Sequence, residues 1–371
     1  MFCCLPVKNY SDVFASSFGL FRIAGECGIG QSLMIRRSVL FFIVGDCTMC
    51  WELDMNIGII GAGSIACKMA ATVKAVGENL YAIASRSQQK ADKFASDHGV
   101  QKAYGSYEQL ASDPAVDLVY IATPHSEHYA NIMMCLEHGR NVICEKSFTM
   151  TSDEARKAFA YAESHGLLLT EAIWTRYLPT RAIVDSYVQR IGELRMLTAN
   201  LAYDIWNVPR ICRADLGGGA LRDVGVYTLN FMAMHFGVDF SSFESTAAIK
   251  DGVDIQCQAA FSYPDGKIAQ LFSGTQCLSD RRGMIYGTKG FVEVDNINEP
   301  EAIMLYDNSR TLIEQAAIPK SLTGFEFELE SSLKAIREHR TECPEMPHGE
   351  SILMMEIMDA MRERWACSVK P

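Results

Sequence analysis

The chain has 371 residues, 49% of them hydrophobic and 21% charged, a composition that excludes disordered, collagen-like and coiled-coil proteins and at this length favours two domains. Its 34 basic and 45 acidic residues give a net charge of −11, which argues against nucleic acid as the main partner. The 13 cysteines are an odd number scattered over the chain and indicate reduced thiols in a reducing, cytoplasmic compartment.

Residues 1–54 show no sustained helical or alternating periodicity, and we predict a poorly ordered or non-native extension. The apolar run of residues 39–44 is too short to span a membrane, which takes roughly 20 apolar residues, so no membrane association is expected. Arg36 and Arg37 precede this run as in a twin-arginine export signal, but no small-residue cleavage site follows. We therefore favour an extension over an export signal, with Met55 opening the first domain.

From Met55 onward, short apolar runs alternate with helical stretches that end at glycine. The pattern predicts strands over residues 56–61, 80–84, 116–122, 142–144 and 167–170, and helices over 64–76, 88–98, 127–138 and 152–165. Repeated strand–helix units are typical of a doubly wound parallel sheet in an α/β fold. Residues 55–172 are therefore interpreted as a dinucleotide-binding Rossmann domain.

The first strand-to-helix turn contains the run Gly61-Ala62-Gly63-Ser64-Ile65-Ala66, which fits G-x-G-x-x-A. Gly61 makes the tight turn, and Gly63 lets the backbone approach a pyrophosphate at the helix N-terminus. Because a strand precedes the motif and a helix follows it, we expect this turn, with Ser64 and Ile65, to bind a dinucleotide rather than to be a bare glycine turn.

The end of the second strand indicates which dinucleotide is bound. An acidic residue there would bind the ribose 2′-hydroxyl of NAD, but this sequence has Ser85-Arg86-Ser87. Hydroxyls around a guanidinium can hold a 2′-phosphate, whereas the alternative is a solvated loop arginine. Ser85 and Arg86 therefore favour NADP as the cofactor, with NAD also possible.

Thr123 and Pro124 end a strand at the carboxyl edge of the predicted sheet, where ligands bind in such folds. Thr123 could face the cofactor there. His125 and His128 follow, three residues apart, and a histidine pair at that spacing could bind a metal. No third ligand lies nearby in the sequence, so we favour structural or substrate-contact roles and predict no metal site.

Glu145 and Lys146 end the next strand, where the lysine would point into the cofactor crevice. It could bond a sugar hydroxyl or depress the pKa of a neighbouring acid, although a solvated lysine is the alternative. After a glycine-rich run at 217–219, Asp223 and Tyr227 share a face if that segment is helical. A tyrosine near a lysine can exchange a proton with an alcohol–ketone pair. Equally, Asp223 could cap a helix and Tyr227 could pack in a core.

Taken together, these motifs resemble the Gfo/Idh/MocA oxidoreductases. The resemblance rests on the strand-end glycines, Ala122-Thr123-Pro124, Glu145-Lys146 and the Asp223/Tyr227 pair. Within the family, residues 171–177 and 217–227 are most similar to the branch of dimeric dihydrodiol dehydrogenases and NADP-dependent D-xylose 1-dehydrogenases. The similarity runs from about Met55 to Trp365.

The resemblance implies hydride transfer between NAD(P) and a hydroxyl or carbonyl carbon of a sugar or cyclic diol. Lys146 and Tyr227 would be the proton-transfer pair, positioned by Asp223, with Lys146 lowering the tyrosine pKa. The implied cofactor contacts are Gly61, Gly63, Ser64, Ile65, Ser85, Arg86, Thr123, Pro124, His128, Glu145 and Lys146, and the implied substrate contacts are His125, Trp174, Arg176 and Tyr227. The alternative function is a non-catalytic NAD(P)-sensing regulator on the same fold.

One residue departs from the family pattern. The family usually has proline after the Glu-Lys pair, and this chain has Ser147. A Lys-Pro bond can be cis, whereas a cis bond before another residue costs about 2.5–4 kcal/mol. We therefore expect that the chain around Lys146 could run differently, which would alter the reach of the lysine.

Residues 173–371 are interpreted as a substrate-binding and dimerisation domain of α+β type, with an open, mostly antiparallel sheet and helices on one face. Strands are predicted over residues 195–204, 242–249, 253–263, 267–276, 284–286, 291–294 and 302–306, and helices over 325–339 and 351–365. Ile255, Cys257 and Ala259 alternate with polar residues on the face left to be covered. The resemblance implies that this face meets a second copy in a homodimer.

Overall fold

The computed structural model describes residues 33–36, 39–44, 47–52 and 54–368, and the chain divides into two compact units, Met1–Leu53 and Asp54–Pro371. In the first unit, an antiparallel sheet is formed by β1 (Leu33–Arg36), β2 (Val39–Val44) and β3 (Cys47–Glu52). The apolar run at 39–44 is the central strand of this sheet. The predicted poor order of residues 1–54 falls largely on residues outside the described ones and stays a prediction.

The second unit begins with a six-stranded parallel sheet, as predicted. Its strands are β4 (Asn56–Ile60), β5 (Asn79–Ala84), β6 (Lys102–Tyr104), β7 (Leu118–Ile121), β8 (Asn141–Glu145) and β9 (Leu169–Ala172), in the order β6-β5-β4-β7-β8-β9. This is the doubly wound order of dinucleotide-binding folds. Because the winding reverses at β4, the ligand crevice is expected beyond the carboxyl ends of β4 and β7.

Helices connect these strands: α1 (Ser64–Val76), α2 (Gln88–His98), α3 (Tyr107–Ala111), α4 (His128–Glu137) and α5 (Ser152–His165). Three of them end at a glycine in the left-handed conformation, namely Gly77, Gly99 and Gly166. The strands are apolar on both faces, and Ile57, Ile59 and Ile60 of β4 are fully buried. Helices therefore cover both faces of the sheet, as parallel sheets require.

An eight-stranded sheet forms the other layer of the second unit. Its strands are β10 (Leu194–Ala202), β11 (Ser242–Lys250), β12 (Val253–Ser262), β13 (Ile268–Gly274), β14 (Gly283–Gly287), β15 (Gly290–Val294), β16 (Ile303–Asp307) and β17 (Leu312–Gln315). In the order β11-β12-β13-β10-β14-β15-β16-β17, every pair is antiparallel except β10 with β13. The predicted open, mostly antiparallel sheet is confirmed.

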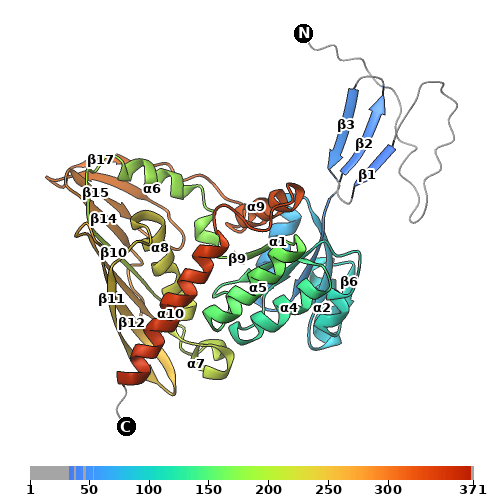
Figure 1. Cartoon of the computed structure of the whole chain (residues 1–371), viewed down its shortest axis with the longest axis horizontal. Coiled ribbons are helices and arrows are strands. Elements are labelled where there is room, and N and C mark those ends of the chain that lie inside the picture. The colour runs from blue at the N-terminus through green and yellow to red at the C-terminus, as the bar shows by residue number, and fades with distance from the viewer. Residues whose placement is uncertain (1–32, 37–38, 45–46, 53, 369–371) are drawn as a thin grey trace. The chain divides into compact units, whose positions relative to one another are not determined.

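Figure 1 shows that helices cover a single face of this larger sheet: α6 (Thr180–Val188), α8 (Val226–Phe236) and α10 (His348–Ser368). The short α7 (Pro209–Cys212) lies in the loop that precedes α8. Among the described residues, no helix combines the length and apolar character needed to cross a bilayer.

The end of the chain returns to the parallel sheet. α9 (Glu326–Arg337) packs against α1, and Phe325 and Leu329 share a buried core with Ile57 of β4. α10 packs against both α5 and β11. The two layers of the unit are thus joined by the last two helices as well as by the chain crossing at residue 173.

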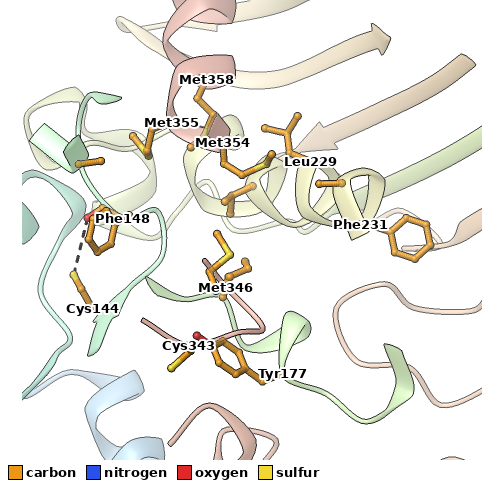
Figure 2. Close-up of a cluster of buried hydrophobic side chains, with 14 of the residues drawn as sticks. Cys144, Phe148, Tyr177, Leu229, Phe231, Cys343, Met346, Met354, Met355 and Met358 are labelled. Atoms are coloured by element: carbon orange, nitrogen blue, oxygen red, sulfur yellow. Dashed lines mark hydrogen bonds between the residues drawn. The ribbon is translucent and has the colours of Figure 1, made fainter. Parts of the chain in front are cut away.

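A methionine-rich core holds the loop after β8 in place (Figure 2). Met354, Met355 and Met358 of α10 lie together with Phe148 of that loop and Leu229 of α8, and all of them are buried. Flexible thioether side chains fill irregular gaps between elements of different kinds. The position of the segment that follows Lys146 is therefore set by packing on α10.

The uncovered face of the larger sheet carries different side chains from those predicted. Cys257 and Ala259 are buried, which places them on the helix-covered face. Met196, Ile268 and Phe272 are instead exposed, at 51%, 46% and 47%. Alternation along a strand separates two faces, but it does not say which face the helices cover.

Candidate functional site

A cavity of about 590 Å³ lies beyond the carboxyl ends of β4, β7 and β8 and reaches Tyr227 of α8. It is lined by most of the residues predicted for the site: Gly61, Gly63, Ser64, Ile65, Ser85, Arg86, Thr123, Pro124, His125, Glu145, Lys146, Trp174 and Tyr227. His128, Asp223 and Arg176 are not among its lining residues. The sheet edge and the helix N-termini therefore bring together segments more than 160 positions apart.

The glycine turn is shaped for a phosphate group. Gly61 has a φ of 100°, and a Cβ there would lie 2.6 Å from the Ala122 carbonyl oxygen, so only glycine fits. Gly63 begins α1 with no side-chain cap, and a Cβ there would meet nothing within 4 Å. Free N–H groups at a helix N-terminus beside empty space form a cradle that fits a dinucleotide pyrophosphate.

The far end of the cavity is basic. Arg86 is exposed and lines the cavity with Ser85, Ser87 and Lys90. The side chains of Arg86 and Lys90 make no hydrogen bond or ion pair with any described residue. The two cations meet at this end of the cavity, Arg86 from just after the end of β5 and Lys90 from the first turn of α2. This end suits a ribose 2′-phosphate, and Lys90 is a contact that the sequence interpretation missed.

His125 and His128 tie three loops together. His125 places Nδ1 at 2.9 Å from the Gly217 oxygen and Nε2 at 3.1 Å from the Lys146 oxygen. His128 places Nδ1 at 3.0 Å from the Ser147 oxygen and Nε2 at 2.9 Å from the Thr123 oxygen. Burial lowers the pKa of both, that of His125 to about 3. His128, predicted as a cofactor contact, is fully buried and does not line the cavity, and its ring holds the backbone around Thr123 and Ser147.

Lys146 and Asp223 form a buried charge pair. The Lys146 ammonium donates to the Asp223 carbonyl oxygen at 2.6 Å and lies 3.2 Å from its carboxylate. The Arg210 guanidinium donates to the same carboxylate from the cavity side. Burial would raise the pKa of Asp223, but Lys146 and Arg210 outweigh it and hold that pKa below its ordinary value. One carboxylate thus orients two cations.

Asp223 lies in a π-helical turn, Leu221–Gly225, that leads into α8. Turns of this kind are rare and frequent at functional sites. Asp223 therefore does not cap a regular helix, which was the structural alternative for this residue. The turn presents its carbonyl oxygens to Lys146 and Ser147.

Tyr227 follows the turn, with the Lys146 ammonium 5.1 Å from its ring centre. Burial raises the pKa of Tyr227 well above its usual value of 10, the charges of Glu145 and Asp223 add to this, and a hydrogen bond with Trp174 opposes it. Any lowering of this pKa by the Lys146 ammonium is therefore outweighed by burial and by the two carboxylates. The hydroxyl is consequently protonated at neutral pH and able to donate.

Glu145 lies beside Lys146 with both carboxylate oxygens occupied. The Tyr120 hydroxyl donates to one oxygen, and the Lys146 backbone N–H lies 3.2 Å from the other. Burial raises the pKa of Glu145. Its contacts hold the end of β8 at the cavity wall.

Ser147 does not divert the lysine. The Lys146–Ser147 peptide bond is cis, and the Lys146 side chain reaches Asp223 and the cavity. The Ser147 hydroxyl, fully buried, donates to the Arg222 carbonyl oxygen at 2.8 Å. The serine fastens its own segment to the π-helical turn, and the lysine still faces the cavity.

Replacing Ser147 with alanine is expected to lower turnover about fivefold, because the loss of one hydrogen bond, worth about 1 kcal/mol, loosens the turn beside Lys146 and leaves the Arg222 oxygen unpaired. Thr149→Val is the matched control, since the Thr149 hydroxyl in the same loop bonds only the Thr151 oxygen, at 2.8 Å. Thermal unfolding and kcat are measured for both. Equal losses of kcat in the two variants would contradict a specific role for Ser147.

Arg176 is the other predicted contact that the structure corrects. Its side chain is fully buried and donates to Asn230 of α8, at 2.5 Å, and to Glu350 of α10. Burial lowers its pKa, and Glu350 opposes this. Arg176 follows Trp174 in a 3-10 turn, so the two side chains diverge, and only Trp174 lines the cavity.

Several lining residues were absent from the sequence interpretation: Lys68, Lys90, Tyr107, Arg210, Leu216, Asn298 and Phe325. The ring of Phe325 stacks on Trp174, with centres 5.2 Å apart. Within the described part of the chain, no group of three or more His, Cys, Asp or Glu residues could hold a metal ion.

Comparisons with known proteins cover nearly all of the second unit. Residues 55–173 match the model of an oxidoreductase family with an NAD-binding Rossmann fold, and residues 179–293 match the GFO/IDH/MocA C-terminal domain. The trans-1,2-dihydrobenzene-1,2-diol dehydrogenase of Homo sapiens is 32% identical over 325 residues, covering 84% of this chain and 97% of that protein. The Xenopus tropicalis enzyme of the same name is 31% identical, covering 81% and 95%.

Solved structures share the fold. A 3-ketoreductase from Actinomadura kijaniata, in complex with NADP and TDP-benzene, superposes with a TM-score of 0.76 at 25% identity, covering 84% of this chain and 97% of that one. A levoglucosan dehydrogenase with NADH and levoglucosan gives a TM-score of 0.76 at 18% identity, with the same coverage.

Proposed function

The chain belongs to the Gfo/Idh/MocA family of NAD(P)-dependent oxidoreductases, and from this premise we propose that it transfers a hydride between NADP and a hydroxyl-bearing carbon of a cyclic diol or sugar. Its curated relatives are dehydrogenases, which identifies the chain as an NAD(P)-dependent dehydrogenase. A catalytic function is therefore favoured over that of a sensing regulator. The observation that carries the proposal is one cavity holding the glycine cradle, Lys146 and Tyr227.

The residues divide the chemistry between them. The bound cofactor supplies or accepts the hydride, and Tyr227 exchanges the hydroxyl proton of the substrate as an acid or base. Lys146, oriented by Asp223, places a positive charge near the hydroxyl or alkoxide that develops during transfer. The stacked Trp174 and Phe325 rings present a flat apolar wall that suits a ring-shaped substrate.

The loop that precedes the turn adds polar contacts. Arg210 is half exposed and lines the cavity together with Leu216 and Asn298. A guanidinium held at one end by Asp223 can direct its remaining N–H groups at substrate hydroxyls. We therefore assign Arg210 to substrate recognition.

The function is tested by following the absorbance of NADPH while the protein is incubated with a panel of trans-diols, aldopyranoses and their ketones. We expect at least one ring-shaped diol or sugar to be turned over by the wild-type protein. Binding of NADP, followed by a thermal shift, without turnover of any member would favour the regulator.

NADP is expected to bind more tightly than NAD because Arg86 holds the 2′-phosphate. Arg86→Ala should weaken NADP binding by roughly 1.5–3 kcal/mol, the worth of a hydrogen bond to a charged group, and leave NAD almost unchanged. Lys93→Ala is the control, because Lys93 lies further along α2 and pairs with Asp97. Dissociation constants for both cofactors decide the matter, and equal losses for NADP and NAD would remove the proposed role.

We also propose a cytoplasmic homodimer joined through the uncovered sheet face. Met196 and Ile268 are direct neighbours on β10 and β13, and Phe272 is exposed on the same side. Phe272→Glu should place a charge in the interface and shift the protein to monomer in sedimentation analysis. Leu278→Glu, at a side chain 71% exposed beyond the end of β13, is the control. A wild-type monomer at micromolar concentration would contradict the proposal.

A further inference from the structure

A second cavity, of about 210 Å³, lies behind the π-helical turn that carries Asp223. Its walls are Gly218, the hairpin between β11 and β12 at Gly252, and the end of α10 at Trp365. It shares no lining residue with the cofactor cavity. The loop before the turn separates the two spaces, because Leu216 lines the front cavity while Ala214 and Gly218 line the rear one.

Two arginines face this rear cavity. Arg222 is 4% exposed and makes one hydrogen bond, from Nη2 to the Met150 oxygen at 2.8 Å. Arg362 is exposed at the mouth of the cavity, and its side chain makes no hydrogen bond or ion pair with any residue that the structure describes. The two guanidiniums repel each other, which together with burial lowers the pKa of Arg222 to about 10. An anion between them would relieve that repulsion.

The acidic groups nearby do not complete the pairing. Asp254 also lines the cavity, but one of its oxygens accepts from the Leu221 N–H at 2.6 Å. Burial raises its pKa to about 6, so near neutral pH it supplies at most one negative charge against the two guanidiniums. Asp359 and Glu154 act on Arg222 from outside the cavity, where they accept from the Ser152 and Met150 N–H groups.

We propose that this rear cavity binds a small organic anion, a carboxylate or a phosphate monoester, between Arg222 and Arg362 with its carbon skeleton against Trp365. Guanidinium groups match the planar or tetrahedral oxygens of such anions. At roughly 30 Å³ for each water, the space corresponds to about seven waters, and therefore to an anion of similarly few heavy atoms. The Trp365 indole N–H donates to the Ser245 hydroxyl at 3.2 Å, which leaves the apolar ring to contact the bound anion.

The bound anion would act on the catalytic turn. The Arg222 carbonyl accepts from Ser147, the next residue is Asp223, and the Asp223 carbonyl accepts from Lys146 at 2.6 Å. An anion that draws the Arg222 side chain into the rear cavity would therefore shift the backbone segment that orients Lys146. The regulatory part of the inference rests on the proposed function, whereas the binding part does not.

Isothermal titration of the full-length protein, saturated with NADP so that the phosphate sites of the front cavity are filled, tests the binding. Malonate and inorganic phosphate are the probes. We expect saturable binding of at least one, weakened at least tenfold by Arg362→Gln and unaffected by Arg364→Gln. Arg364 is the matched control because it lies on the same helix and bonds the Phe243 oxygen and Glu244 instead.

Binding of malonate alone would assign the site to carboxylates, and binding of phosphate alone would assign it to phosphoryl groups. Absence of saturable binding for both, or equal binding by the wild type and Arg362→Gln, overturns the proposal. Should Arg362→Gln lower the Tm, Arg362→Lys restores the charge and is expected to bind within a few-fold of the wild type.

Regulation is read separately from binding. With a turned-over substrate, the bound probe is expected to change kcat in the wild type and in Arg364→Gln but not in Arg362→Gln. A protein that binds the anion yet turns over no substrate would refute the proposed function and leave the anion site standing. Binding with an unchanged kcat would refute the regulatory part alone.

Discussion

Replacing Tyr227 with phenylalanine is expected to lower turnover by about 10²–10⁴, the usual contribution of a positioned acid or base, while the affinity for NADP survives. The change deletes only the hydroxyl, so the ring stays beneath the Lys146 ammonium, 5.1 Å from its centre. The measurement is kcat and KM by NADPH absorbance, together with the NADP dissociation constant.

Tyr107→Phe is the matched control for this loss. Tyr107 lines the same cavity, near Arg86, so its hydroxyl is remote from the proton-transfer pair. Turnover should be unchanged in this variant. A Tyr227→Phe protein that retains more than a tenth of wild-type kcat would show that the proton passes through another group.

The parallel half of the fold was accessible from the sequence because its elements are local and strongly patterned. Three of its helices end at a glycine, Gly77, Gly99 or Gly166. In each case the signal that ends the helix is visible in the sequence. The short β6 and α3 were missed, since a strand of three residues leaves no measurable alternation. The last helices were found as helices, but their return to α1 and α5 depends on tertiary packing that no local pattern encodes.

Site residues could be predicted where their position at the end of a strand determines where their side chains lie. Residues at the carboxyl ends of parallel strands must meet at one sheet edge, which is why Gly61, Thr123 and Lys146 line one cavity. Arg176 and His128 do not line the cavity, because sequence neighbours in a turn or helix can point to opposite sides. Both are buried in contacts with backbone or side chains that lie behind the cavity wall.

Other contacts could not be found because they come from distant segments. Arg210 reaches Asp223 from a loop with no regular pattern, and Phe325 stacks on Trp174 from 151 positions further along the chain. Lys90 was missed for a related reason, since Arg86 precedes the extended Ser87 and only Lys90 lies in α2, so their spacing alone does not place them together. The effect of Ser147 was also hidden, because its hydrogen-bond partner, the Arg222 carbonyl, is a backbone group that every sequence would offer.

Lys146→Met is expected to lower turnover by about 10²–10³, the usual cost of removing one preorganised donor at a reacting oxygen. Methionine keeps the unbranched side chain but removes the ammonium that bonds the Asp223 carbonyl at 2.6 Å. Asp223 is then left with Arg210, and its pKa rises, because Lys146 contributes most to holding that pKa down. The measurement is kcat against pH in both directions of the reaction.

The sign of the pH change separates an electrostatic role of Lys146 from a merely structural one. In the direction of ketone reduction, Tyr227 must donate a proton, so the rate falls as the tyrosine ionises at alkaline pH. Loss of a nearby positive charge raises the tyrosine pKa further, so the alkaline limb of the profile moves upward in Lys146→Met. In the direction of alcohol oxidation, tyrosinate accepts the proton, and the rising limb moves upward by the same shift.

Two further variants complete this test. Lys146→Arg keeps the charge and should return the limb toward its wild-type position even if kcat recovers only in part. The Lys146→Met, Tyr227→Phe double variant should be little worse than the more damaged single variant, because residues that act as one unit do not have additive effects. Full additivity, or a lower kcat with an unmoved pH profile, would show that Lys146 only supports the turn at Asp223 and that the ionisation of Tyr227 is set by its burial and by the groups around it.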